Sequence, residues 1–127
     1  MTNLILLVDD DAGLRSLLRK MLEMGGYEVV EAADGIEALA ALEQSLPAIV
    51  ILDVMMPNMD GITFCKKVRA DERWAELPIV ILSGKTQQWA IDEGLAAGAN
   101  EYLCKPIAFG DLLQKVRAGL ADSAADS

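Results

Sequence analysis

Short apolar runs alternate with longer amphipathic segments along this chain, and each alternation predicts a strand followed by a helix. Uninterrupted apolar runs occupy residues 4–8, 49–52 and 79–82 and indicate strands that are buried on both faces. Two weaker runs, at residues 27–31 and 101–104, complete a set of five predicted strands.

The segments after these runs carry apolar residues at helical spacing. The first predicted helix has an apolar face made of Leu14, Leu17, Leu18, Met21 and Leu22. Further helices are predicted at about 35–45, from residue 61 onward and at about 87–97. The last predicted helix has an apolar face made of Phe109, Leu112, Leu113, Val116 and Leu120.

Strands that alternate with helices predict an α/β domain whose parallel sheet is covered on both faces. Five such units and right-handed crossovers favour the flavodoxin-like strand order 2-1-3-4-5, with five flanking helices. We expect this domain to span residues 1–121, and the small and polar residues 122–127 to form a flexible C-terminal tail. Ligands of such folds bind at the carboxyl ends of the strands.

The composition of the 127-residue chain narrows the partners that it can have. Hydrophobic residues make up 53% and aromatic residues only 5%, which indicates a core of aliphatic side chains. A formal charge of −9 argues against direct binding to nucleic acid or to an anionic membrane, because both require clustered cations. The apolar runs are too short to span a bilayer and no signal peptide is recognisable, so we expect no membrane association.

Cysteine and tryptophan are sparse. Cys65 and Cys104 stand far apart in a chain without histidine, so we expect reduced thiols that serve in packing and no structural zinc. We expect Trp74 and Trp89 at the flanks of helices or on the surface.

The strand at residues 49–52 ends on a carboxylate, Asp53, and a turn rich in Pro, Asn, Asp and Gly follows at once. In that turn Asp60-Gly61 is expected to start the next helix. A carboxylate at a strand end is unfavourable unless it is solvated, paired or bound to a metal. We therefore expect Asp53 to serve a chemical function.

Polar side chains also follow three other strands. Asp9 and Asp10 follow the first, Ser83 the fourth and Lys105 the fifth. These strands and the one before Asp53 are neighbours in the order 2-1-3-4-5, so the side chains are expected to converge at one edge of the sheet. Clustered carboxylates suit Mg²⁺, and a carboxylate can accept a phosphoryl group whose oxygens a lysine and a hydroxyl would stabilise.

This ordered set of residues resembles the receiver domain of two-component response regulators, over residues 3 to about 121. The matching positions are Asp9-Asp10, the run Asp53-x-x-Met56-Pro57-x-Met59-Asp60-Gly61, Ser83 and Lys105-Pro106. The resemblance implies a phosphorylation-switched signalling module rather than an enzyme, one that catalyses only its own phosphotransfer and autodephosphorylation.

The resemblance also implies a role for each matching residue. Asp53 would be the phosphoacceptor, and Asp10, Asp53 and the backbone carbonyl of Met55 would bind Mg²⁺. Asp9 would complete the metal site by orienting a metal-bound water. Lys105 would contact the phosphoryl oxygens, and its bond to the proline that follows would be cis. Ser83 and Tyr102 would be the switch residues.

The partners that the resemblance implies are a sensor histidine kinase or a histidine phosphotransfer protein as donor. Output would pass through the face of the helix at 87–97, the strand at 101–104 and the last helix. It would reach a downstream protein target or an output domain outside this chain, with a phosphorylation-dependent dimer as one form. The expected location is the bacterial cytoplasm.

The chain departs from the common pattern of the family beside the site. Gly84 stands where alanine is frequent, which predicts a more mobile loop and a looser switch. Met55 and Lys85 occupy the positions that tune the loss of the phosphoryl group in this family.

Other functions fit the same residues less well. A phosphatase of the haloacid dehalogenase type needs an acid two residues after its nucleophile, where this chain has Met55. A flavodoxin-like cofactor binder needs a hydroxyl-rich phosphate loop, but three aspartates, which repel phosphate, follow the first strand. Gly84-Lys85-Thr86 lacks the earlier glycine of a P-loop, since Ile79 stands there. A receiver-like protein that binds a partner without turning over phosphate remains an alternative.

Overall fold

The computed structural model describes residues 3–125, in which strands and helices alternate through ten elements. In chain order these are β1 Leu4–Val8, α1 Ala12–Met24, β2 Glu28–Ala32, α2 Gly35–Gln44, β3 Ile49–Leu52, α3 Gly61–Ala70, β4 Ile79–Ser83, α4 Gln88–Ala96, β5 Glu101–Cys104 and α5 Phe109–Ala125. The strands form one parallel sheet in the order β2-β1-β3-β4-β5. The predicted flavodoxin-like α/β fold is therefore confirmed.

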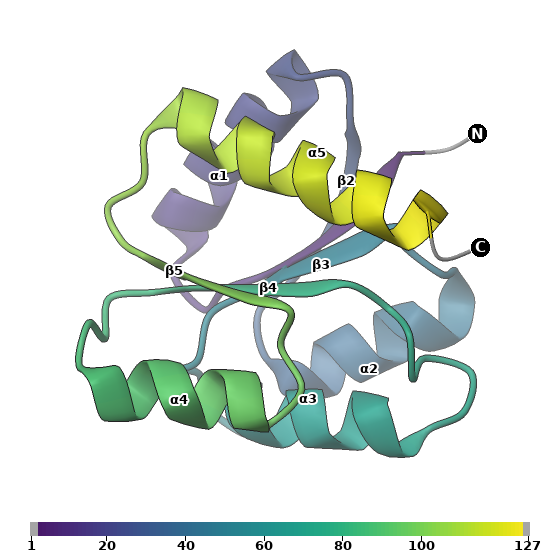
Figure 1. Cartoon of the computed structure of the whole chain (residues 1–127). Helices are drawn as coiled ribbons and strands as arrows, with labels where there is room; N and C mark the ends of the chain where they lie inside the picture. The colour runs from purple at the N-terminus through teal and green to yellow at the C-terminus, as the bar shows by residue number, and fades with distance from the viewer. Residues whose placement is uncertain (1–2, 126–127) are drawn as a thin grey trace.

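Helices cover both faces of this sheet (Figure 1): α1 and α5 lie on one face, and α2, α3 and α4 lie on the other. Successive residues of β3 point to opposite faces, so Ile49 and Ile51 pack under α1 and α5 while Val50 and Leu52 join the cluster on the other side. All four are at most 1% exposed. Burial on both faces is the reason why this strand is apolar without interruption.

Three helices begin with an aspartate cap directly beyond the carboxyl edge of the sheet. Asp11, Asp34 and Asp60 cap α1, α2 and α3, and each side chain accepts a hydrogen bond from a backbone N–H three residues ahead, at 2.8–3.1 Å. The helix starts that the sequence predicted at about residue 35 and at Asp60-Gly61 are confirmed. The connections after these strands are thereby fixed at the edge where the polar residues gather.

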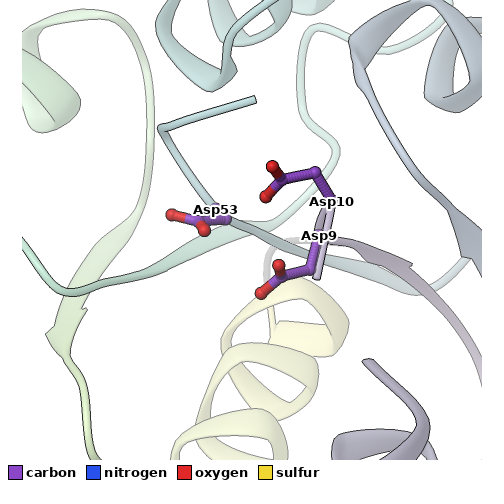
Figure 2. A group of neighbouring side chains, drawn as sticks. All are labelled: Asp9, Asp10 and Asp53. Atoms are coloured by element: carbon purple, nitrogen blue, oxygen red, sulfur yellow. The ribbon is translucent and has the colours of Figure 1, made fainter. Parts of the chain in front are cut away.

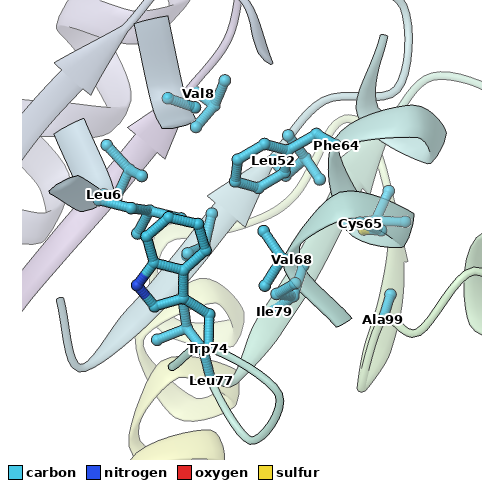
Figure 3. Packing of buried hydrophobic residues seen from close by; sticks show 14 of the residues in the cluster. Leu6, Val8, Leu52, Phe64, Cys65, Val68, Trp74, Leu77, Ile79 and Ala99 are labelled. Atoms are coloured by element: carbon cyan, nitrogen blue, oxygen red, sulfur yellow. The ribbon is translucent and has the colours of Figure 1, made fainter. Parts of the chain in front are cut away.

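The packing corrects two predictions about tryptophan and cysteine. Trp74, expected at a helix flank or on the surface, lies in the turn that follows α3 but is only 7% exposed and belongs to the cluster under α2 and α3 (Figure 3). The turn that follows α3 brings this ring back over the core. Cys65 is buried as expected, but Cys104 is exposed, because it ends the edge strand β5. Trp89 is 57% exposed, as expected.

The helices lie where the sequence predicted them, but two residues assigned to their buried sides are exposed. Leu17 of α1 is 55% exposed and Phe109 of α5 is 38% exposed, although periodicity assigned both to the buried side. Each helix contacts the sheet over a narrower stripe than the sequence pattern suggests. None of the helices described between residues 3 and 125 is long and apolar enough to cross a membrane.

At its C-terminal end α5 continues to Ala125, so most of the segment predicted as a tail, 122–127, is helical backbone. Residues 126 and 127 lie outside the described part of the chain. Flexibility of this end stays a prediction.

Candidate functional site

Three carboxylates meet at the carboxyl edge of the sheet. Asp9 and Asp10 follow β1, Asp53 follows β3, and these two strands are paired in parallel register. One carboxylate oxygen from each residue lies within 4.8 Å of the others, and Figure 2 shows the three side chains turned to the same side. Asp9 is 2% exposed and Asp53 9% exposed, whereas Asp10 is exposed. The cluster is therefore anchored in the protein and open to solvent through Asp10.

The Asp53 side chain is held by its own loop. Its Oδ1 accepts a hydrogen bond from the backbone N–H of Val54 at 2.7 Å and a longer one from that of Met55 at 3.4 Å. Gly61 lies against the same peptide, since a Cβ there would approach the carbonyl oxygen of Asp53 to 2.4 Å. The position of this carboxylate thus depends on the backbone of the β3–α3 loop, residues 54–60.

Lys105 bridges the two buried carboxylates. Its Nζ donates to Asp9 Oδ2 at 3.0 Å and to Asp53 Oδ2 at 3.1 Å. Burial lowers the pKa of Lys105, but the hydrogen bond to Asp9 and the charge of Asp53 raise it more, so the net shift is upward. The lysine therefore stays charged and offsets part of the negative charge of the cluster. The peptide bond between Lys105 and Pro106 is cis, as predicted.

Hydrogen bonds from two other residues hold Asp9 in place. Its Oδ1 accepts from the backbone N–H of Asp11 at 2.9 Å, and its carbonyl oxygen accepts from the guanidinium of Arg15 at 2.6 Å. The role of Arg15 was not predicted from the sequence. The one sequence feature that could have indicated it is its position one helical turn after the acidic run. Arg15 also bonds Glu31 at 2.8 Å, so α1 and β2 hold the end of β1.

The donor set of this cluster is that of a Mg²⁺ site: carboxylate oxygens from two neighbouring strand ends, with one side open to water. A groove of about 640 Å³ adjoins it and is lined in part by Asp10, Met55 and Lys85. Mg²⁺ retains several of its waters when bound, and this groove leaves room for them. The backbone carbonyl of Met55 as a ligand stays a prediction.

Ser83 and Tyr102, the predicted switch residues, are both joined to Lys85. Ser83 ends β4, is 1% exposed, and accepts a hydrogen bond at its Oγ from the Lys85 N–H at 3.2 Å. The Tyr102 hydroxyl donates to the Lys85 carbonyl at 2.8 Å. Gly94 of α4 makes room for this ring, since a Cβ there would come within 2.9 Å of it. Nothing in the sequence indicated that Tyr102 contacts Lys85 or Gly94.

Lys85 also reaches the surface of α4. Its Nζ lies 5.4 Å from the ring centroid of Trp89, within the range of a cation–π contact. One residue of the β4–α4 loop thus contacts Ser83 and Tyr102 through its backbone and an exposed tryptophan through its side chain. The loop is a physical link between Ser83, at the carboxyl end of β4, and the outer face of α4.

Comparison with known proteins agrees with this geometry. The family described as the response regulator receiver domain matches residues 5–117. The Synechocystis regulator RpaA, a DNA-binding transcriptional regulator, is 40% identical over 114 residues, which is 90% of this chain and 47% of that protein. The response regulator MprA of Mycobacterium leprae is 42% identical over 127 residues, covering 97% of this chain and 55% of that protein. The chain therefore spans about half the length of the curated relatives it matches.

Solved structures resemble the chain over nearly its whole length. A response regulator from Chloroflexus aurantiacus is 40% identical with a TM-score of 0.91, covering 95% of this chain and 99% of that one. A CheY-like receiver domain from Methanospirillum hungatei is 28% identical with a TM-score of 0.93, and the two chains are covered completely (100%). The receiver domain of the Pseudomonas aeruginosa sensor kinase PA1611, solved with a magnesium ion in its active-site cleft, is 30% identical with a TM-score of 0.89, covering 95% of this chain and 99% of that one.

Proposed function

This chain belongs to the response regulator receiver domain family and is a phospho-receiver signalling module, and from that premise we propose that Asp53 is its phosphoacceptor. The observation that carries the proposal is the position of Asp53 within the cluster. It is the one carboxylate that both contacts Lys105 and adjoins the loop lining the open groove. Asp9 is more deeply buried than Asp53, and Asp10 is exposed and available as a metal ligand.

The proposed reaction is in-line transfer from a phosphohistidine. A carboxylate oxygen of Asp53 forms a bond to phosphorus while the bond between phosphorus and the histidine nitrogen breaks, and the imidazole leaves with that electron pair. Asp10, Asp53 and the Met55 carbonyl would hold Mg²⁺, with Asp9 orienting a bound water, and the ion would supply charge neutralisation.

Lys105 and Ser83 complete the proposed site from the neighbouring strands. The ammonium of Lys105, 3.1 Å from Asp53, would bind a phosphoryl oxygen once the carboxylate has become an acyl phosphate. Ser83 keeps its hydroxyl proton free for a second phosphoryl oxygen, because its bond with Lys85 uses Oγ as acceptor. A shift of Ser83 would then move the Lys85 peptide, and with it the partner of the Tyr102 hydroxyl.

Output is proposed to pass through the surface of α4, β5 and α5. Lys85 and Tyr102 connect the site to this surface, and Trp89 is exposed on it. The donor would be a sensor histidine kinase or a histidine phosphotransfer protein, which family membership supports. The receiver would act on a downstream protein or an output domain outside this chain, as a monomer or a phosphorylation-dependent dimer. We place it in the bacterial cytoplasm, in line with its unpaired thiols.

Intact mass after incubation with acetyl phosphate and Mg²⁺ tests the proposal. The wild-type protein should gain the mass of one HPO₃ group, and Asp53→Asn should gain none while its circular dichroism is unchanged. Asp92→Asn removes an exposed acid of α4 and serves as the matched control that still gains the group. Labelling of Asp53→Asn to the level of wild type would exclude Asp53 as the acceptor.

A receiver that accepts phosphate only from its kinase would gain no mass in this experiment. Beryllofluoride, a stand-in for the acyl phosphate, separates that case from a protein that only binds a partner. Binding of beryllofluoride that requires both Mg²⁺ and Asp53 supports the phosphoacceptor. Absence of such binding to the wild type would overturn the proposal.

A further inference from the structure

The β3–α3 loop begins directly after Asp53 and contains an unusual backbone conformation. Asn58 has φ 66°, and it is the one residue other than glycine with positive φ between residues 3 and 125. Asparagine tolerates this left-handed region better than most residues. The loop therefore depends on a specific conformation at this position.

Asn58 is joined to the start of α2. Its Nδ2 donates a hydrogen bond of 2.7 Å to Oδ2 of Asp34, a buried residue 24 positions earlier in the chain. The other oxygen of Asp34 accepts from the backbone N–H of Glu37 at 2.8 Å and caps the helix. A single carboxylate thus holds both the first turn of α2 and the turning point of the loop.

A second bond reinforces this attachment. The backbone N–H of Gly35 donates to the carbonyl oxygen of Met59 at 3.0 Å. A Cβ at Gly35 would come within 2.9 Å of that oxygen, so the two segments can approach only because position 35 is a glycine. The loop and the start of α2 therefore lie backbone against backbone.

The other end of the loop carries the hydrogen-bond donors of the phosphoacceptor. The N–H of Gly61 donates to the carbonyl of Val54 at 2.9 Å and closes the loop on itself. Val54 and Met55 direct their own N–H groups at Oδ1 of Asp53. The loop that contains Asn58 is thus continuous with the amides that orient the Asp53 carboxylate.

We propose that Asp34 and Asn58 are a positioning pair whose hydrogen bond holds the conformation of the β3–α3 loop. In that conformation the Val54 and Met55 amides point at Asp53, and the Met55 carbonyl is presented to the metal. This inference rests on the proposed function for the role of Met55 as a ligand. A cap for α2 explains the bond from Asp34 to Glu37 but not the one to Asn58, which lies outside that helix.

Two substitutions separate the pair from other roles of its members. Asn58→Gly keeps the left-handed backbone accessible and removes only the amide. Asp34→Ser keeps an N-cap oxygen for α2 but has too short a side chain to reach Asn58. Asn100→Ala is the matched control, because Asn100 is also an exposed asparagine and accepts hydrogen bonds from Ile79 and Arg69 at the opposite edge of the sheet.

The primary measurement is the affinity of the unphosphorylated protein for Mg²⁺ by calorimetry, with the free energy of unfolding in urea alongside. Asn58→Gly and Asp34→Ser should each weaken Mg²⁺ binding by about tenfold, the loss typical of residues that orient metal ligands. The double variant should be no weaker than either single one, because both remove the same bond. Asn100→Ala should reduce stability and leave Mg²⁺ affinity unchanged.

Amide hydrogen exchange without metal gives a second measurement that does not depend on the proposed function. The Gly35 amide, which donates to Met59, should exchange faster in Asn58→Gly than in wild type and at the wild-type rate in Asn100→Ala. The inference is overturned if Asn58→Gly binds Mg²⁺ with wild-type affinity and its Gly35 amide exchanges at the wild-type rate. Additive losses of Mg²⁺ affinity in the double variant would also overturn it. If wild type binds no Mg²⁺ and accepts no phosphoryl group, the proposed function fails, and Gly35 exchange alone decides whether the pair holds the loop.

Discussion

The Lys105 ammonium lies 3.1 Å from the Asp53 carboxylate, although 52 positions separate the two residues in the chain. Asp53 follows β3 and Lys105 follows β5, and β4 lies between these strands in the sheet. The lysine therefore reaches past the end of β4, where Ser83 is buried. Its position makes it a counter-ion for the acidic cluster. As a proposal, the same ammonium would bind the phosphoryl group once Asp53 is phosphorylated.

We expect Lys105→Ala to destabilise the metal-free protein by about 1.5–3 kcal/mol, because two buried carboxylates lose a charge-assisted hydrogen bond. Mg²⁺ affinity should stay close to wild type, since the lysine is not a ligand. The variant should lose the coupling of the site to the α4–β5–α5 surface. Urea unfolding, magnesium calorimetry and amide NMR shifts of that surface on addition of beryllofluoride measure these effects. Wild-type shifts in the variant would contradict the switching role of Lys105.

Tyr102→Phe removes the hydroxyl that bonds the Lys85 carbonyl and keeps the ring in place against Gly94. The loss of one hydrogen bond should lower the free energy of unfolding by about 1 kcal/mol. Amides of the β4–α4 loop should exchange faster with solvent, and the fluorescence of Trp89 should change. Tyr27→Phe, in the cluster on the opposite face of the sheet, is the control. Unchanged loop exchange in Tyr102→Phe would show that this bond does not hold the loop.

Gly61→Ala should impair both folding and phosphorylation. The added Cβ would meet the Asp53 carbonyl oxygen at 2.4 Å and the Val54 Cα at 2.9 Å, so the backbone that carries the phosphoacceptor must move. Gly84→Ala is the contrasting variant, because no atom lies within 4 Å of a Cβ there. It should stabilise the protein by about 0.4–1 kcal/mol through a less flexible unfolded chain. Thermal unfolding and the rate of labelling by acetyl phosphate should be measured for both variants. Equal changes in Gly61→Ala and Gly84→Ala would refute the steric argument.

The pKa of Asp34 lies below its usual range because the Glu37 N–H, and then the Asn58 amide, donate hydrogen bonds to the carboxylate. The folded protein therefore binds this proton more weakly than the unfolded chain does. The stability that follows is present above the unfolded pKa of about 4 and is lost as pH falls through the folded value. The free energy of unfolding in urea should fall more for wild type than for Asp34→Asn between about pH 5 and about pH 3, the range in which carboxylates titrate. Parallel curves would rule out this contribution.

Much of the fold and of the site was predictable because it depends on local pattern and on strand order. Runs such as Ile49–Leu52 are apolar throughout since both faces of the strand are covered, and this is visible in sequence. Residues that directly follow neighbouring parallel strands meet at one edge of the sheet, so the sequence alone groups Asp53, Asp10 and Lys105.

The sequence by itself determined the alternation of strands and helices, the order of the sheet and the set of polar residues at its carboxyl edge. Only the tertiary structure decided that Trp74 is buried, that Lys85 joins Ser83 to Tyr102, and that Asp34 holds Asn58. Periodicity reports which side of an element avoids water, and that is a property of neighbouring residues. The angle at which a turn returns to the core, and the partner that a side chain finds many positions away, are fixed only when whole elements pack together.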